Sequence, residues 1–348
     1  MPVRLRQRAC IGRYLLEQKL RRRDRFPLIL QLEPLFACNL SCGGCGKVRH
    51  PAEVLRRRMP VETAVAAVRE CGAPMVSIAG GEPLLHPGIG RLVDVLVRHK
   101  VYIYLCTNGL LLEEALGAFR PSPFLTWVVH LDGLRERHDA AVGRAGVFDR
   151  AVRGVLAAQR AGFGVMTNTT VYAADSAGTV RDVLDYLNDE LCVDAMMIAP
   201  GYAQQNAGGD GHYLTAAASR ELCRAVLADR GTRAWRFNHS PIYLDFLTGR
   251  VELDCTPWAI PCYSVLGWQR PCYQRADGYC RTYRELLETT DWSRYGHASG
   301  DPGCRDCLAH SGFEPSAVLR TLRSPGELRR AARETVGGGR RGSGPREA

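Results

Sequence analysis

The chain has 348 residues, 46% hydrophobic and 24% charged, a composition typical of a soluble globular protein of roughly two domains. No apolar run approaches the ~20 residues that cross a bilayer, and arginines interrupt the apolar stretches near the N-terminus, so we expect neither a spanning helix nor a signal peptide. The net charge of +10 lies mostly in residues 4–25, which hold nine Arg or Lys against two acids; this argues against nucleic-acid binding. We expect a cytoplasmic protein.

The first predicted element is a basic amphipathic helix within residues 1–26. Leu5, Ile11 and Leu15 recur at about helical spacing, with arginines between them. Such a helix binds an anionic bilayer, which would give a peripheral contact with the inner membrane surface through residues 4–25. A helix packed across an open barrel, with its arginines in solvent, fits the same pattern, and the sequence leaves both interpretations open.

Residues 27–232 alternate apolar, β-branched runs with helical segments. The runs predict strands at 28–36, 75–81, 101–108, 125–133, 165–172 and 195–202. The segments between and after them predict helices at 61–71, 89–100, 113–119, 148–161, 180–191 and 216–228. Six such units imply a parallel sheet with right-handed crossovers, two units short of a closed eight-stranded barrel. The predicted fold class is therefore α/β, a partial (β/α)6 barrel with its chemistry at the C-terminal ends of the strands.

The rest of the chain differs in composition. Residues 233–336 hold six of the fourteen cysteines together with many aromatic residues and prolines, and predict a smaller C-terminal domain. Residues 337–348, rich in Gly and Arg, predict a disordered tail.

Three cysteines follow the first predicted strand as Cys38, Cys42 and Cys45, a C-x₃-C-x₂-C spacing. In a reduced compartment such cysteines indicate metal ligation or catalysis. The tight spacing suits one loop wrapped around a four-iron, four-sulfur cluster, and three ligands for four irons leave one iron open. Gly43 and Gly44 let the backbone approach the cluster closely. A zinc site lacking a ligand is the alternative.

This loop resembles that of the radical S-adenosylmethionine (SAM) superfamily, in which SAM chelates the open iron and is cleaved reductively to a 5′-deoxyadenosyl radical. The second strand ends in a sequence similar to the superfamily's GGEP element: Gly80, Gly81, Glu82 and Pro83. The resemblance implies that this turn, through its backbone and Glu82, binds the methionine ammonium.

Further SAM contacts are predicted at or near other strand ends, although ordinary turns or structural hydrogen bonds explain each residue equally well. They are Asn108, Asp132, Asn168 and Thr170. His130 is interpreted as an interior histidine with satisfied hydrogen bonds.

Longer segments resemble the adenosylhopane synthases of hopanoid biosynthesis. They are 32–40, 45–47, 76–84, 104–108, 129–134, 146–149, 240–241, 267–272 and 291–292. The resemblance implies addition of the adenosyl radical to the terminal alkene of diploptene, a hydrophobic isoprenoid, to give adenosylhopane. It also implies an electron donor such as flavodoxin or ferredoxin, with SAM consumed as a cosubstrate.

Two segments depart from that family's pattern. Residues 201–214 are richer in glycine than expected, and Ser311 stands where the family has cysteine. These differences leave room for another isoprenoid substrate.

Four later cysteines have a spacing that resembles the auxiliary-cluster extensions of other radical SAM enzymes: Cys255, Cys272, Cys304 and Cys307. Four thiolates also suit a structural zinc, and packed free thiols are a third interpretation. The sequence leaves cluster and zinc undecided.

Cys106, at the end of the third strand, is the predicted catalytic residue. A tertiary alkyl radical needs a hydrogen donor, and the S–H bond is weaker than the C–H bond formed. Small-residue packing is the alternative role. Two other functions stay open for the chain: a radical SAM enzyme that abstracts hydrogen from another substrate, and a non-catalytic iron–sulfur sensor or electron carrier.

Overall fold

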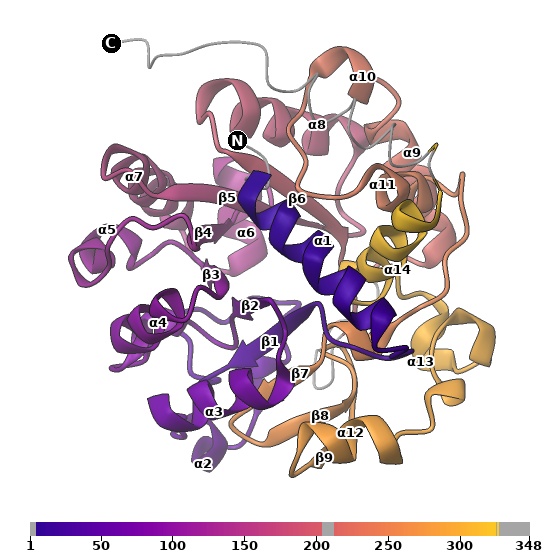
Figure 1. The fold of residues 1–348 in the computed structure, drawn as a ribbon. Helices are drawn as coiled ribbons and strands as arrows, with labels where there is room; N and C mark the ends of the chain where they lie inside the picture. Colours follow the sequence, from indigo (N-terminus) through magenta and orange to yellow (C-terminus); the bar gives the residue numbers. More distant parts are fainter. Residues whose placement is uncertain (1–4, 204–211, 325, 327–348) are drawn as a thin grey trace.

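We describe a computed structural model of the chain over residues 5–203, 212–324 and 326. Nine strands form one sheet in the order β6-β5-β4-β3-β2-β1-β7-β8-β9 (Figure 1). The first six strands are parallel and confirm the six predicted ones: β1 (Ile29–Glu33), β2 (Met75–Ile78), β3 (Tyr102–Thr107), β4 (Leu125–His130), β5 (Gly164–Val171) and β6 (Ala195–Pro200). The α/β partial barrel is thereby confirmed.

The sheet extends beyond the predicted barrel by three short strands from the C-terminal region. β7 (Cys262–Ser264) runs parallel to β1, while β8 (Gly267–Pro271) and β9 (Ala276–Cys280) continue as antiparallel hairpins. At the opposite edge, Phe237 pairs with Met196 of β6. The C-terminal region therefore borders both edges of the open barrel and shares its sheet. The predicted division at residue 233 stays a prediction, and the tail at 337–348 lies outside the described residues.

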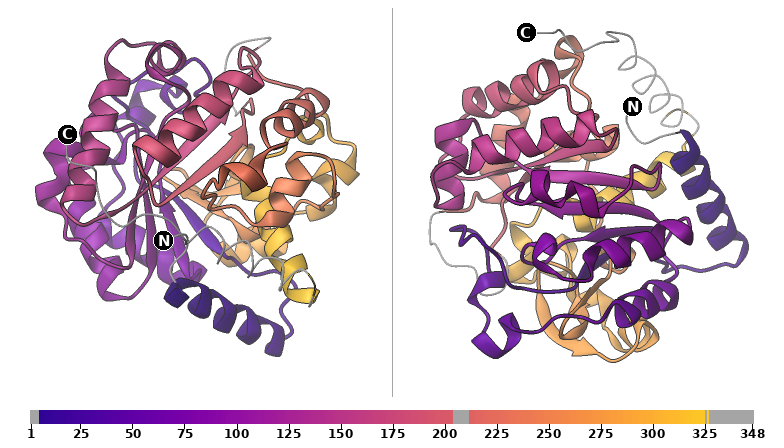
Figure 2. Two further views of the ribbon diagram at one scale, coloured as in Figure 1. Left: turned by 90° about the horizontal axis from the view of Figure 1, so that it is seen from above. Right: turned by 90° about the vertical axis from the view of Figure 1, so that its left-hand side faces the viewer.

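Helices cover the outer face of the parallel strands (Figure 2). They are α3 (Val61–Cys71), α4 (Ile89–Arg98), α5 (Leu112–Ala115), α6 (Arg135–Val142), α7 (Val147–Arg160), α8 (Ala177–Asp185) and α9 (Ala216–Val226). The remaining helices are α1 (Leu5–Leu20), α2 (Ala52–Leu55), α10 (Arg230–Arg233), α11 (Pro241–Leu247), α12 (Tyr283–Thr289), α13 (Pro302–Arg305) and α14 (His310–Arg323). α8 begins before the predicted residue 180 because Ser176 and Thr179 form a capping box.

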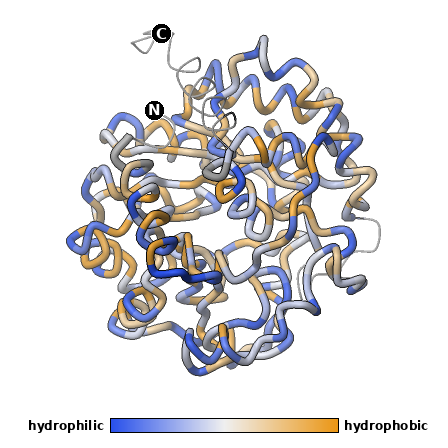
Figure 3. Tube along the Cα trace, turned by 45° about the vertical axis from the view of Figure 1, so that its right-hand side comes forward, coloured by the Kyte–Doolittle hydropathy of each residue, from blue (hydrophilic) through white to orange (hydrophobic). Residues whose placement is uncertain are grey.

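Side chains alternate across each strand, since successive Cβ atoms point to opposite faces. On β3, Ile103 and Leu105 join the core beneath the outer helices, while Tyr104 and Cys106 face the interior of the barrel. Hydrophilic and hydrophobic residues intermingle along the outer helices (Figure 3), as expected for helices with one buried face.

Within the segment predicted as a basic amphipathic helix, residues 5–20 form α1, which packs across the end of the barrel where the strands begin. Cys10 and Ile11 contact an apolar interior cluster that contains Met75 and Tyr102, the first residues of their strands. The opposite face of α1 exposes Leu16 (58%) and Leu20 (76%). Among the described residues, no helix combines the length and apolarity needed to cross a bilayer.

Candidate active site

The cluster loop, residues 38–45, leaves β1 at the C-terminal edge of the sheet. Leu40 anchors it in a small apolar cluster with Leu110, Val142 and Val147, against which Cys38 and Cys42 pack. The loop tightens through a bond from the Cys45 amide to the Cys42 carbonyl (3.1 Å). One loop therefore carries all three thiols, as predicted.

The three thiols lie near one another. Burial, and then the neighbouring Cys45 and Cys38, raise the pKa of Cys42 to about 12. Three thiols on one short loop can each bind one iron of a four-iron, four-sulfur cluster and leave the fourth iron open. The loop thus fits a cluster, whose loading must release thiol protons.

The Gly80–Gly81 turn is bonded to the segment that leads into the cluster loop. The Gly81 amide donates to the Leu35 carbonyl (3.0 Å), and the Glu82 amide donates to the Ala37 carbonyl (2.9 Å). A Cβ on Gly80 would overlap the Leu35 carbonyl, and one on Gly81 would overlap the Ala37 carbonyl. These glycines are required because two backbones meet here, one residue before Cys38. The Glu82 carbonyl accepts from the Leu85 amide (3.0 Å), so the Gly81 carbonyl is the one that this turn can offer to a ligand ammonium.

The Glu82 carboxylate is directed into the protein and is fully buried. It accepts hydrogen bonds from the Thr107 hydroxyl (3.0 Å) and from the amides of Leu84 (3.0 Å) and Asn108 (2.9 Å). Burial raises the pKa of Glu82 to about 7, although these three bonds favour the ionised form. Its visible role is to join the ends of β2 and β3; side-chain contact of Glu82 or Pro83 with SAM stays a prediction.

Asn108 bonds the cluster loop. Its Nδ2 donates to Asn39 Oδ1 (2.7 Å) and lies 3.7 Å from Cys38 Sγ, while its Oδ1 accepts from the Leu110 amide (3.0 Å). The side chain therefore orients Cys38. The sequence placed Asn108 at the site, but the bond to Asn39 depends on a long-range contact that it does not reveal.

The other predicted SAM contacts form one network around His130. His130 Nε2 pairs with Asp132 Oδ2 (2.7 Å), Asp132 Oδ1 accepts from the Thr170 amide (2.8 Å), and Asn168 Nδ2 lies 3.4 Å from His130 Nδ1. Burial disfavours the charged His130, but Asp132 outweighs it and raises the pKa of His130. His130 is a satisfied interior histidine, as interpreted. SAM contact at these residues stays a prediction.

Cys106 faces the barrel interior between this polar layer and the apolar cluster below it. Its Sγ lies 3.6 Å from Ser77 Oγ on the neighbouring strand. Burial raises the pKa of Cys106 to about 11, so the thiol is protonated at neutral pH. A protonated thiol is the form that can donate a hydrogen atom.

The second set of four cysteines comes together from three separate segments. Cys255, Cys272, Cys304 and Cys307 all line one small cavity, closed on other sides by Tyr202 and Phe313. Burial, and then the neighbouring Cys307, Cys272 and Cys304, raise the pKa of Cys255. Four gathered thiols can hold either an auxiliary iron–sulfur cluster or a zinc ion, and both stay predictions.

Ser311 does not belong to the second cysteine site. It is buried on α14, and it is not among the described residues that line the four-cysteine cavity.

A buried ion pair that the sequence did not reveal lies between the two cysteine regions. Lys47 Nζ bonds Glu33 Oε2 at 2.7 Å, with side chains 9% and 0% exposed. The ammonium also lies over the rings of Phe36 (5.0 Å) and Tyr273 (4.9 Å). Lys47 follows Cys45 by two residues and Tyr273 follows Cys272 directly, so the pair joins the regions. In the sequence, the sign of this ion pair was Glu33, an acidic residue within an otherwise apolar strand.

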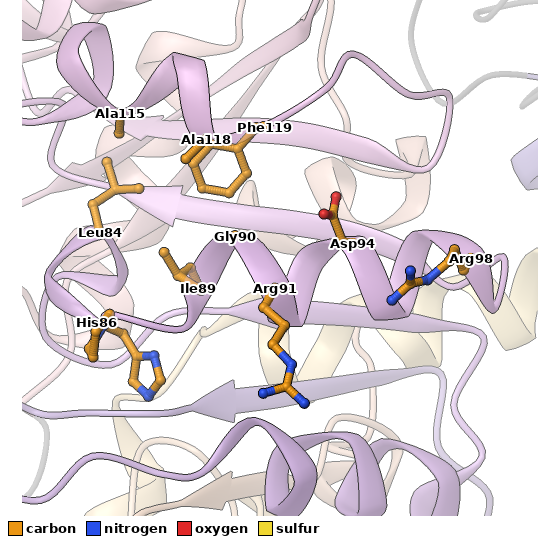
Figure 4. A pocket seen from close by; sticks show the side chains of 11 residues that line it. Leu84, His86, Ile89, Gly90, Arg91, Asp94, Arg98, Ala115, Ala118 and Phe119 are labelled. Carbon is orange, nitrogen blue, oxygen red and sulfur yellow. The ribbon is translucent and has the colours of Figure 1, made fainter.

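A groove of about 630 Å³ lies on the outer surface. It lies beside α4 and α5, lined by Leu84, Ile89, Arg91 and Phe119 among others (Figure 4). None of the cysteines lines it. It is separate from the candidate site.

Comparison with known families agrees with this geometry. Residues 32–187 match the family model "Radical SAM superfamily", and residues 196–331 match "Domain of unknown function (DUF3463)". The second match begins within β6 and includes all four cysteines of the second set.

Curated relatives and solved structures are similar over part of the chain. Mycofactocin maturase MftC of Mycobacterium ulcerans (strain Agy99) is 30% identical over 161 residues, 45% of this chain and 43% of that protein. AdoMet-dependent heme synthase of Methanosarcina barkeri (strain Fusaro / DSM 804) is 29% identical over 150 residues, 42% and 43%. The chain therefore matches less than half the length of these relatives.

The structure of Streptococcus suis SuiB bound to S-adenosylmethionine aligns with a TM-score of 0.59 at 19% identity, covering 74% of this chain and 62% of SuiB. At that identity the likeness shows the fold alone. None of these matches is an adenosylhopane synthase, so the finer resemblance rests on the sequence segments alone.

Proposed function

We propose, from the premise that the chain contains a radical SAM domain at residues 32–187, that it joins the adenosyl group of SAM to the terminal alkene of an apolar isoprenoid. The substrate we propose is a hopene such as diploptene, and the product is adenosylhopane. The observation that carries the proposal is the buried thiol of Cys106 on the inner face of β3, beside Ser77 and an apolar interior.

The polar strand ends hold the cofactors in this proposal. Cys38, Cys42 and Cys45 would hold a four-iron, four-sulfur cluster, and the Gly81 carbonyl would receive the methionine ammonium. Such a cluster would supply the one electron needed to cleave the sulfonium C–S bond of SAM into methionine and the 5′-deoxyadenosyl radical. Asn108 keeps Cys38 in place, and Asp132 joins the end of β4 to β5 by accepting from the Thr170 amide.

Cys106 completes the addition. The C5′ carbon bonds the CH₂ end of the alkene, which leaves the unpaired electron on the tertiary carbon. Cys106 then gives its hydrogen atom to that carbon and becomes a thiyl radical, which returns to the thiol by taking one electron and one proton. The donor protein thus supplies two electrons per adduct. Ser77 fixes the thiol at the interior face.

The side chains below Cys106 form a packed apolar layer: Met75, Val128 and Met166 lie there with the rings of Tyr102 and Tyr104. We infer that an apolar substrate would lie against this layer from the side of the strand ends, where removing hydrocarbon surface from water contributes about 25 cal/mol per Å².

The relatives favour a second candidate, since their names describe a mycofactocin maturase and a heme synthase rather than isoprenoid enzymes. In this alternative the adenosyl radical abstracts hydrogen from another substrate and is released as free 5′-deoxyadenosine. An anaerobic assay with SAM, a reductant and diploptene separates the two. Mass spectrometry should find adenosine bonded to the hydrocarbon; free 5′-deoxyadenosine alone would reject adenosylation.

We also propose that α1 contacts an anionic membrane surface, where such a substrate resides. Leu16 and Leu20 are exposed beside Arg13 and Lys19 on a helix whose other face closes the barrel. Replacing both leucines by glutamate should lower binding to anionic vesicles about tenfold while leaving SAM cleavage in solution unchanged. Unchanged vesicle binding would leave α1 with its packing role alone.

A further inference from the structure

We propose that Tyr213 and Asp306 are positioning residues of the cluster loop. Together they form a chain of contacts from the turn of the second cysteine set, residues 304–307, to the cluster loop at residues 38–45. The inference rests on the proposed function only through the assignment of the cluster loop, and it is independent of the substrate.

Tyr213 bonds the cluster loop directly. Its hydroxyl donates to the carbonyl of Gly44 at 3.0 Å, and Gly44 directly precedes Cys45. A Cβ on Gly44 would lie 3.2 Å from the rings of His212 and Tyr172, so the loop also packs against these two side chains. Because glycine leaves the backbone free to adopt many conformations, the Tyr213 bond restrains the residue next to a proposed iron ligand.

The backbone that leads into Tyr213 is held at the C-terminal end of β5. The Ala173 amide, two residues beyond β5, donates to the His212 carbonyl at 3.1 Å. The His212 ring lies 4.3 Å from the ring of Tyr172, centroid to centroid. Tyr213 therefore approaches the loop from a fixed base on one side.

Asp306 fixes the chain on the other side of Tyr213. Its Oδ1 accepts from the amide of Ala216 at 2.8 Å, and Ala216 is the first residue of α9. The first amides of a helix have no acceptor within the helix, and the helix dipole favours a carboxylate at this end. Thr215 caps the same turn by accepting from the Ala218 amide at 3.2 Å. The start of α9, three residues after Tyr213, is thus tied to Asp306.

Asp306 is in turn held by the second cysteine site, because it lies between Cys304 and Cys307. The Cys307 amide donates to the Cys304 carbonyl at 3.3 Å, and the His297 ring is bonded to the Cys307 carbonyl at 2.6 Å. A metal ion or cluster bound by the two thiols would hold this turn further. Loading of the second site would then also restrain the loop of the first.

Hydrogen exchange of the cluster-loop amides, followed by mass spectrometry in the anaerobically reconstituted protein, tests the contact at Gly44. Tyr213→Phe keeps the ring and removes the hydroxyl. The matched control is Tyr14→Phe, which removes a hydroxyl that donates to the Pro27 carbonyl (2.7 Å) at the opposite end of the barrel. We expect residues 38–46 to exchange about tenfold faster in Tyr213→Phe and within about twofold of the parent in the control. Parent-like exchange in Tyr213→Phe would overturn the proposal.

Asp306→Ala tests whether the C-terminal turn acts on the loop through Tyr213. We expect the same loop amides to exchange about fivefold faster, and Asp306→Asn, which keeps an acceptor oxygen, to stay within about twofold of the parent. Asp306→Ala added to Tyr213→Phe should cause no further increase, because the contact through which it acts is already gone. A further increase in the double variant, or no effect of Asp306→Ala alone, would overturn the role of Asp306. Asp291→Ala, which removes an acceptor of the Ser293 amide (3.2 Å) after α12, is the control and should leave the loop unchanged.

Exchange in α4 reports on global stability in every variant. If Asp306→Ala raises it as well, Ala216→Pro decides, since proline at the first helical position lacks the N–H that Asp306 accepts and still begins a helix well. Thr215 before it is extended, as a residue before proline prefers. Ala216→Pro should raise loop exchange about fivefold, and parent-like exchange would reject the role of Asp306. The readout requires no hydrocarbon, so the expected exchange without an adenosyl adduct would reject the proposed reaction and keep both positioning residues.

Discussion

The two cysteine regions are built in different ways from the same ligand. The cluster loop takes three thiols from eight consecutive residues and leaves Ser41 and Gly43 in solvent. The C-terminal set takes four thiols from three segments that span residues 255–307 and encloses them with Tyr202 and Phe313.

The difference suggests that the three-thiol site carries out the chemistry and that the four-thiol site stabilises the fold. A three-thiol site leaves one metal position for SAM, as catalytic metal sites keep a position open, whereas four thiols complete a closed site. A closed site that joins distant segments also stabilises the fold around it, because the metal binds the folded arrangement and not the unfolded chain. We therefore expect loss of chemistry from damage to the first region, and loss of stability from damage to the second.

The largest expected effect comes from the loop cysteines. Replacing Cys38, Cys42 or Cys45 by alanine should abolish SAM cleavage, measured as methionine formation, because the open-iron cluster needs all three ligands. Cys192, exposed and remote from both sets, is the control, and its Ser variant should cleave SAM normally. Cleavage retained by any of the three alanine variants would remove that residue from the cluster.

Gly81 tests how strictly the loop is positioned. In Gly81→Ala the new methyl group would overlap the Ala37 carbonyl, so the segment before Cys38 must shift, and we expect a loss of SAM cleavage of at least about a hundredfold. Gly117→Ala is the matched variant, since a Cβ there meets nothing within 4 Å. Equal activities in the two variants would mean that the turn does not position the loop.

The closed site should respond in stability and in iron content. In Cys272→Ser/Cys307→Ser we expect iron to fall by about half, with a decrease in unfolding free energy of about 2–5 kcal/mol if metal loss resembles loss of a native cross-link. If elemental analysis of the wild-type protein finds zinc, the second site holds zinc and not an auxiliary cluster. Full iron content in the variant would show that these cysteines hold none.

Lys47 tests the connection between the two regions. Lys47→Met leaves the Glu33 carboxylate buried without its partner, and we expect a loss of about 3–5 kcal/mol in unfolding free energy. Adding Glu33→Gln should restore much of the loss, because the uncompensated charge is then gone. Urea unfolding of both single variants and the double variant gives the coupling energy; simple additivity would show that the pair does not act as a unit.

The strands and the cluster loop followed from local sequence, whereas the side-chain partners did not. The six apolar runs correspond to β1–β6. Strands of a parallel sheet covered on both faces are apolar along their whole length, and this pattern is visible in the local sequence. β7–β9 were missed because β7 has three residues and pairs with β1 across more than two hundred positions of chain. The inward turn of Glu82 and the Glu33–Lys47 pair also depend on tertiary contacts, between residues 25 and 14 positions apart, that local patterns do not reveal.

The most direct measurement of the central claim is the isotope content of the hydrocarbon product made in deuterated water, where the Cys106 thiol carries deuterium. The account predicts one deuterium atom on the tertiary carbon of the adenosyl adduct from the wild-type protein. It also predicts normal SAM cleavage but little saturated adduct from Cys106→Ala, whose thiol is gone. An adduct without deuterium, or an alanine variant that makes the same deuterated adduct at the same rate, would contradict it.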